Sequence, residues 1–360
     1  MKETILSRRK FVAGSAAAIA AVVGAGALSG CSSSEAGSAS SSAAAQSLDK
    51  IVFIWEPTES ADNYASFREA VAECIEEGSG LPCEMQTTTD YNVTIESLSS
   101  GQAHMASLGA SEYVEAHAKN PAVNIAFVQS NDAGELDQAS YYSMIGVRAE
   151  DVAQYQQEDG SYSLDALKGK NFSFVSLNST SGFVLPANVI AQAENLESTD
   201  ELSESDSFFG TVLFPGSHPG SLYNLMSGEA DAAVFGDYLI DPAVELVSGE
   251  ASQVGAVYRV RDDAETPLNE VAGKEFVIIE SLAVPAVPIS INPDVVPADL
   301  VEKIIAYMCS DEVANNPEIF PDPDDTETVS NWKKTSEDIC FVRADDSYYD
   351  EFRELIGFEG

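Results

Sequence analysis

Short apolar runs alternate with segments of helical periodicity from residue 51 onward, and this alternation limits the fold more than any other feature of the chain. Runs such as 51–54 and 105–108 have the length and character of buried strands. Segments such as 65–77 carry apolar residues at helical spacing and stop at a glycine. One such series ends near 147, and another begins at 172. The pattern predicts parallel α/β layers that are interrupted once.

The second series predicts helices over 183–192 and around 242–247, followed by an apolar strand at 276–279. An amphipathic helix is expected over 298–308. About 310 residues remain once the N-terminal segment is set aside, which is more than one hydrophobic core usually serves. We therefore expect two lobes.

The N-terminal segment is typical of an export signal. Arg8 and Arg9 precede an apolar, alanine- and glycine-rich run over 13–28, as in signals of the twin-arginine type. A permanent membrane helix fits less well, because three glycines interrupt the run and it is barely long enough to span. The sequence Leu-Ser-Gly-Cys that ends at Cys31 resembles the lipobox of bacterial lipoproteins. We expect a signal peptide over 1–30, and a lipidated Cys31 with a flexible Ser/Ala/Gly tether over 31–47.

The net charge excludes several classes of partner. The whole chain has a formal charge of −41, from 18 basic and 59 acidic side chains. Removal of 1–30 takes away four basic residues and one acid, which gives 14 − 58 = −44. A surface this acidic repels nucleic acid and anionic lipid. An anion site in such a chain must rely on short-range hydrogen bonds.

The cysteines and histidines leave redox chemistry open and disfavour a metal site. An even number of cysteines besides Cys31 is compatible with disulfides in an exported protein, and equally with buried thiols. The nearest pairs in sequence are Cys74 with Cys83 and Cys309 with Cys340. No CxxC motif occurs, and the three histidines have no metal-ligand spacing. We expect no metal and no cofactor.

A strand, a small hydroxyl-rich turn and a helix follow one another at four places. The turns contain Ser60, Ser111, the run Ser-Thr-Ser at 179–181, and His218. A helix N-terminus presents unpaired N–H groups and a partial positive charge, and hydroxyls add donors beside them. Several such turns aimed at one place would form an anion site without lysine or arginine. Taken singly, each turn is also an ordinary helix cap at an exposed helix start.

Catalytic motifs do not accompany these turns. Dinucleotide and phosphate loops, Gly-x-Ser-x-Gly and His-Glu-x-x-His are absent from the sequence. A phosphoester hydrolase would need a metal cluster or an activated nucleophile with a base. The residues favour a binding protein that is not an enzyme. A ligand-sensing binding protein and a phosphoester hydrolase remain as alternatives.

The joint pattern resembles the phosphonate-, phosphite- and phosphate-binding proteins that feed ABC importers. The likeness extends over nearly all of 50–360, and its most specific parts are Asn-Ser-Thr-Ser-Gly-Phe-Val-Leu-Pro at 178–186 and Gly-Ser-His at 216–218. The resemblance implies an α/β, two-lobed periplasmic-binding-protein fold of type II. The ligand would lie in the interlobe cleft, and two crossover hinge segments would lie near 142–147 and 276–288. With the interrupted series, it places lobe 1 at 48–142 plus 288–360 and lobe 2 at 143–287.

The resemblance also implies partners and a location. The protein would be a monomer outside the cytoplasm, anchored to the membrane by its lipid. It would bind a small phosphorus oxyanion, namely a phosphonate, phosphite or phosphate. It would deliver that ligand to an ABC transporter permease with its ATPase, and it would bind no nucleic acid.

Site residues carry over from the family by position. The oxyanion is held there by a Ser-Thr-Ser turn and a histidine, between aromatic walls, and we expect two lobe 1 serines to complete the shell. Family members that bind an aminoalkyl phosphonate have an aspartate where this chain has Val287, and their second amine-binding acid falls near Asp237. The loss of one carboxylate disfavours an aminophosphonate. The expected ligand-binding residues are Ser179, Thr180, Ser181, His218, Tyr91, Tyr141, Ser60, Ser111 and Asp237.

Overall fold

The computed structural model describes residues 48–57, 64–325 and 328–358. The expected signal peptide, Cys31 with its tether, and Ser60 lie outside the described residues. Within those residues, no helix has both the length and the apolar character needed to cross a membrane.

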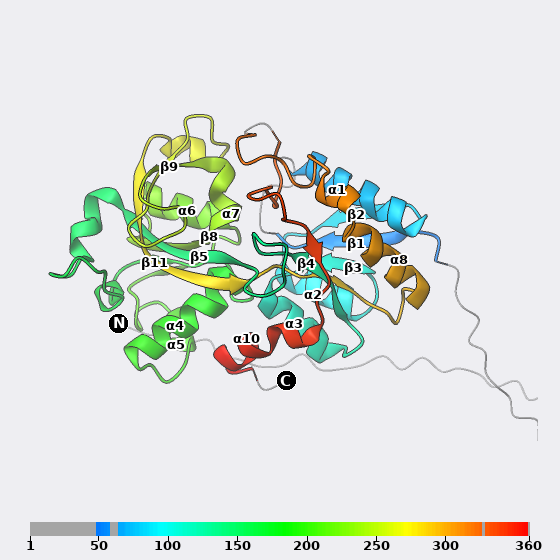
Figure 1. Ribbon diagram of the computed structural model, residues 1–360. Helices are drawn as coiled ribbons and strands as arrows, with labels where there is room; N and C mark the ends of the chain where they lie inside the picture. The colour runs from blue at the N-terminus through cyan, green and yellow to red at the C-terminus, as the bar shows by residue number, and fades with distance from the viewer. Residues whose placement is uncertain (1–47, 58–63, 326–327, 359–360) are drawn as a thin grey trace, which may run out of the picture. The chain divides into compact units, whose positions relative to one another are not determined.

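The first sheet has the strand order β13-β4-β12-β3-β1-β2. Figure 1 labels its strands β1 to β4. Its first three strands in the chain pair in parallel, as the alternating pattern predicts. The other three strands pair antiparallel, so the sheet is mixed. The strands are β1 (Ile51–Trp55), β2 (Cys83–Thr87), β3 (Met105–Ser107), β4 (Asn124–Gln129), β12 (Ile289–Ile291) and β13 (Phe341–Val342). The helices packed with them are α1 (Ala65–Ser79), α2 (Tyr91–Ser99), α3 (Ala110–Lys119), α8 (Ala298–Met308), α9 (Asp311–Ala314) and α10 (Asp350–Leu355).

The second sheet has the order β7-β6-β8-β5-β11-β10-β9. Parallel pairing joins β6 to β7 and β8, whereas the remaining pairs are antiparallel. The strands are β5 (Ser140–Arg148), β6 (Phe172–Ser173), β7 (Val212–Leu213), β8 (Ala232–Gly236), β9 (Val244–Ser248), β10 (Val257–Val260) and β11 (Glu275–Pro285). The helices packed with them are α4 (Leu185–Glu194), α5 (Asp200–Ser203), α6 (His218–Ser227) and α7 (Asp237–Ile240).

Helices cover both faces of each sheet, because the central strands are apolar on both sides. In β1, Ile51 and Phe53 pack with α1 and α8, whereas Val52 and Ile54 pack with α2 and α3. The strand alternates its side chains between faces, so a fully apolar run must be buried on both. In β8, alternate residues face α6 and α4 in the same way.

Two long strands carry the chain between the sheets. β5 and β11 pair antiparallel from Ser140 with Pro285 to Arg148 with Phe276 (Figure 1). A bulge interrupts their register between Ile278 and Glu280. The two-lobed α/β fold of type II, with two crossovers, is confirmed in this architecture. The limits proposed for the lobes, 48–142 plus 288–360 and 143–287, stay a prediction.

One expected helix is wrong. The segment 242–247 forms a single 3₁₀ turn, Asp241–Ala243, and then the edge strand β9. Val244 is buried while the rest of that strand is exposed, so its apolar residues do not follow a helical stripe. The helix expected at 183–192 begins with a π-helical turn, Thr180–Val184, before α4.

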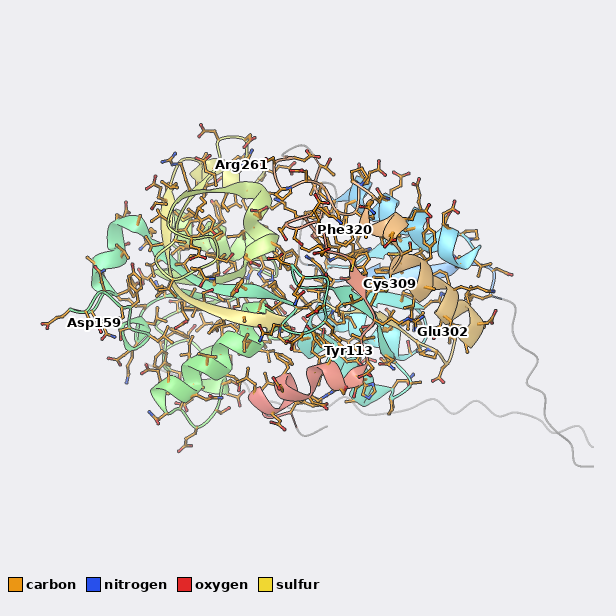
Figure 2. All side chains as sticks on the ribbon, viewed as in Figure 1. Tyr113, Asp159, Arg261, Glu302, Cys309 and Phe320 are labelled. Atoms are coloured by element: carbon orange, nitrogen blue, oxygen red, sulfur yellow. The ribbon has the colours of Figure 1, made fainter. Side chains whose placement is uncertain are left out.

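Neither disulfide is present among the described residues, where all four cysteines are free. Cys74 is buried in the core and its sulfur lies 3.8 Å from the amide nitrogen of Asn316. Cys309 follows the last turn of α8 (Figure 2). Burial raises the pKa of Cys74 and Cys309 to about 11 and that of Cys83 to about 12. Of the two alternatives that the sequence leaves open, the structure has free thiols, of which Cys74 is buried and the other three are partly buried.

Candidate functional site

The Ser-Thr-Ser turn follows the short strand β6 and is held tightly in place. The Ser179 hydroxyl accepts a hydrogen bond from the Gly182 N–H at 3.2 Å, so Ser179 is indeed a helix cap. A Cβ atom on Gly182 would lie 2.4 Å from Val175 Cβ, which makes glycine necessary at this contact. Thr180 and Ser181 are each 2% exposed. The sequence-based expectation of an exposed helix start is therefore wrong for this turn.

His218 lies at the first turn of α6 and is also buried, at 1% exposure. Its Nδ1 accepts a hydrogen bond from the Gly236 N–H at 2.9 Å. In the neutral ring, the proton must then be on Nε2. Burial lowers the pKa of His218 to about 3. The residue is thus a neutral donor with one N–H, and it adds no positive charge.

Ser111 brings α3 of the first sheet against the Ser-Thr-Ser turn of the second. Its backbone N–H donates to Thr180 Oγ1 at 2.8 Å, and the two hydroxyl oxygens lie 2.7 Å apart. The Ser111 hydroxyl also lies 2.9 Å from the carbonyl oxygen of Asn178. The structure therefore joins two of the expected site residues, which are 69 positions apart in the chain.

A carboxylate that the sequence reasoning missed lies between these hydroxyls. Glu112 is 1% exposed, and its Oε2 accepts a hydrogen bond from the Thr180 hydroxyl at 2.7 Å. The Ser111 hydroxyl lies 2.9 Å from the same oxygen. Burial raises the pKa of Glu112 to about 7, although the hydrogen bonds from Thr180 and Ser111 act in the opposite direction. The only signal in the sequence is an acid in the first turn of a helix, which is common on exposed helices.

Gly109 makes room for this carboxylate. A Cβ atom on Gly109 would lie 2.3 Å from Glu112 Oε2 and 2.5 Å from Thr180 Oγ1. The Gly109 N–H donates to a second buried carboxylate, Glu56, at 3.0 Å. The floor of the site thus contains two carboxyl groups beside several hydroxyl donors.

Tyr141 and Asp237 occupy the side of the site formed by the second sheet. Tyr141 packs edge-on against Tyr238 with ring centroids 5.1 Å apart, and burial raises its pKa well above the usual range. Asp237 accepts hydrogen bonds from the N–H groups of Tyr142 and Tyr238 and from the Ser252 hydroxyl. Burial raises the pKa of Asp237 to about 6. These protein donors engage both of its carboxylate oxygens.

The remaining expected wall residue, Tyr91, is buried at the start of α2. The next residue, Asn92, lies 3.4 Å from the side chain of Asn178, which precedes the Ser-Thr-Ser turn. The start of α2 therefore lies near the turn.

A cavity of about 680 Å³ adjoins the site. Its lining includes Tyr141 and Asp237 on one side and Trp332 and Lys333 on the other. An ion pair between Lys333 and Asp241 joins the two sides. A smaller hollow of about 470 Å³ lies at β4 and α8 and contains none of the expected site residues. In the part of the chain that the structure describes, no group of three His, Cys, Asp or Glu residues is arranged to hold a metal.

Comparisons with known proteins agree with the family resemblance that the sequence indicates. A family model described as ABC transporter, phosphonate, periplasmic substrate-binding protein matches residues 53–349. The phosphate-import protein PhnD of Mycolicibacterium smegmatis is 25% identical over 185 residues, which cover 51% of this chain and 54% of that relative. The chain thus matches about half the length of this curated relative.

Two solved structures share the fold. PhnD1 from Prochlorococcus marinus, in complex with methylphosphonate, has a TM-score of 0.60 at 13% identity, covering 85% of this chain and 97% of that one. A binding protein component of an ABC phosphonate transporter from Pseudomonas aeruginosa has a TM-score of 0.58 at 18% identity, covering 85% and 86%. At these identities the likeness shows the architecture.

Proposed function

This chain belongs to the family of periplasmic substrate-binding proteins of phosphonate ABC transporters, and from that premise we propose which ligand it takes and how it holds it. The family is one of binding proteins that act outside the cytoplasm. We propose that the ligand is a small tetrahedral phosphorus oxyanion, namely a phosphonate, phosphite or phosphate. The protein would deliver it to the permease and ATPase of its importer.

The observation that carries the proposal is the meeting of hydroxyl donors from the two sheets. Ser111 of α3 contacts Thr180 of the Ser-Thr-Ser turn, and both residues lie at helix starts, where hydroxyl and N–H donors gather. His218 adds a neutral Nε2–H donor. Fixed donors of this kind act strongly because the surrounding site is buried and of low dielectric.

This arrangement explains how so acidic a protein could bind an anion. The charge of −41 repels anions at long range, but the donors at the site act at short range. A hydrogen bond to a charged ligand contributes about 1.5–3 kcal/mol. A few such bonds outweigh a diffuse surface field, which salt screens beyond about 10 Å.

Titration calorimetry on the mature protein tests the ligand class. We expect binding of at least one of phosphate, phosphite and methylphosphonate, and a loss of affinity of roughly ten- to hundredfold in Thr180→Ala. Thr211→Ala is the matched control, because Thr211 is exposed near the edge strand β7. Unchanged affinity in Thr180→Ala would place the site elsewhere, and no binding of any of the three ligands would refute the ligand class.

We also propose that the mature protein begins at a lipidated Cys31 after a twin-arginine signal. The support is the order of features in the sequence: paired arginines, a mildly apolar run, a lipobox-like cysteine and a Ser/Ala/Gly tether. Cys31→Ala should leave the precursor unprocessed or release the protein from the membrane. Normal processing with unchanged membrane attachment would contradict the proposal.

A further inference from the structure

The Glu112 carboxylate accepts hydrogen bonds from the same hydroxyls that the proposed function assigns to the bound anion. Its Oε2 lies 2.7 Å from the Thr180 hydroxyl oxygen and 2.9 Å from that of Ser111. An oxyanion that engages these two hydroxyls would therefore have an oxygen beside the carboxylate. Two buried groups that carry only lone pairs repel each other, and neither can be hydrated there.

The carboxylate is built into the site and has little room to leave. The side chain of Glu112 is 1% exposed and belongs to the first turn of α3. Its oxygen occupies the space left by the missing Cβ of Gly109, within 2.3 Å of where that atom would lie. Tyr113, the next residue, is fixed through its hydroxyl to Asp346 at 2.9 Å. The start of α3 is thus held from both sides.

A single proton resolves the conflict between the two anionic groups. A proton between a carboxylate oxygen and a phosphoryl oxygen forms a charge-assisted O–H···O hydrogen bond, which is short and strong. We propose that Glu112 couples oxyanion binding to a proton, so that the filled site holds the ligand and Glu112 with one proton shared between them. This inference rests on the proposed function and adds the protonation state in which the site works.

The proton comes from whichever partner has it. A phosphonate monoanion donates its P–OH hydrogen to the ionised Glu112. A phosphonate dianion accepts a hydrogen bond from a protonated Glu112. When both partners have lost their protons, one must be taken up from water, and binding weakens by about tenfold for each further pH unit. Burial raises the pKa of Glu112 to about 7, which puts the onset of this weakening in the physiological range.

Most other titratable groups near Glu112 do not change charge in the same pH range. Burial raises the pKa of Tyr141 and Tyr349 well above the usual range, so both phenols stay neutral. His218 is neutral and Asp237, with a pKa of about 6, is ionised above neutral pH. Glu56 is the remaining carboxyl group, joined to the site through the Gly109 N–H, and it needs its own variant.

The experiment measures the affinity of methylphosphonate at pH 7 and pH 9 by calorimetry, in two buffers of different ionisation enthalpy. For the wild type we expect the affinity to fall by roughly tenfold between the two pH values, with uptake of nearly one proton per ligand at pH 9. For Glu112→Gln, which keeps the shape and removes the charge, we expect a change below about threefold and little proton uptake. Glu96→Gln is the charge control, because Glu96 is exposed and pairs with Lys119.

The possible results either support or overturn the proton coupling. A wild-type affinity that does not depend on pH, with no proton uptake, overturns the coupling even if the variant does not fold, and leaves the proposed function intact. An equal pH dependence in Glu112→Gln overturns it too. So does a dependence that disappears in Glu56→Gln but persists in Glu112→Gln. Failure of the wild type to bind any phosphorus oxyanion refutes both the inference and the proposed function.

Discussion

His218 allows its binding and structural roles to be separated in one substitution. Its Nδ1 accepts the Gly236 N–H, and its Nε2–H is the proposed donor to the ligand. His218→Asn puts a carbonyl oxygen near the position of Nδ1 and deletes the second nitrogen. We expect the variant to fold, to lose about 1–3 kcal/mol of stability through lost packing, and to bind methylphosphonate roughly ten- to hundredfold more weakly.

The pH dependence of stability is an independent test of the protonation state of His218. Burial lowers the pKa of His218 from 6.5 to about 3, so between these values the unfolded ring takes up a proton and the native ring does not. Stability therefore falls as the pH falls below 6.5, by about 1.4 kcal/mol per unit. Between pH 6.5 and 5 this group alone should cost the wild type about 2 kcal/mol.

The pKa shifts of Glu112 and Asp237 change the stability with pH in the opposite direction. Their pKa values are raised in the native state, so they stabilise the fold as the pH falls and lose that contribution as it rises. Both groups are present in the wild type and in His218→Asn. Their contributions cancel in the difference between the two proteins.

The assay is urea unfolding, followed by far-ultraviolet circular dichroism, of both proteins at pH 7, 6 and 5. We expect the wild type to be the more stable protein at pH 7, and its advantage to shrink by about 2 kcal/mol by pH 5. A difference that stays constant with pH would refute the buried, neutral state of His218. The loss of binding would then need another explanation.

Three further predictions concern packing, the cavity and the thiols. Gly182→Ala should destabilise the protein by about 1–3 kcal/mol in thermal or urea unfolding, since its Cβ would lie 2.4 Å from Val175 Cβ; an unchanged stability would contradict the contact. Lys333→Met, which removes the ion pair with Asp241, should lower ligand affinity by about two- to fivefold at low salt and not at high salt, whereas Lys303→Met should not change it. A thiol reagent added to the unfolded, unreduced protein from residue 32 onward should find four thiols, and a count of two or none would show disulfides.

Much of the fold could be predicted from local periodicity. The run 51–54 is apolar at every position, which predicts a strand buried on both faces, and β1 has this environment. The expected helices at 65–77 and 298–308 correspond to α1 and α8, because glycine or capping signals and a 3.6-residue stripe are properties of neighbouring residues. Where the local signal is short, as at 242–247, pairing with β10 at the sheet edge stabilises a strand in place of the expected helix.

The sequence by itself also determined which residue types could hold an anion, because hydroxyls at helix starts are visible in the order of the chain. Only the tertiary structure decided which of them meet. Ser111 and Thr180 lie in contact because two sheets place α3 against the Ser-Thr-Ser turn, and nothing near either residue in the chain specifies that contact. The burial of Glu112, and with it a carboxylate among the donors, depends on the same approach and on the absence of a side chain at Gly109. Periodicity is a property of neighbours in sequence, whereas the environment of a side chain is set by residues that are distant in sequence.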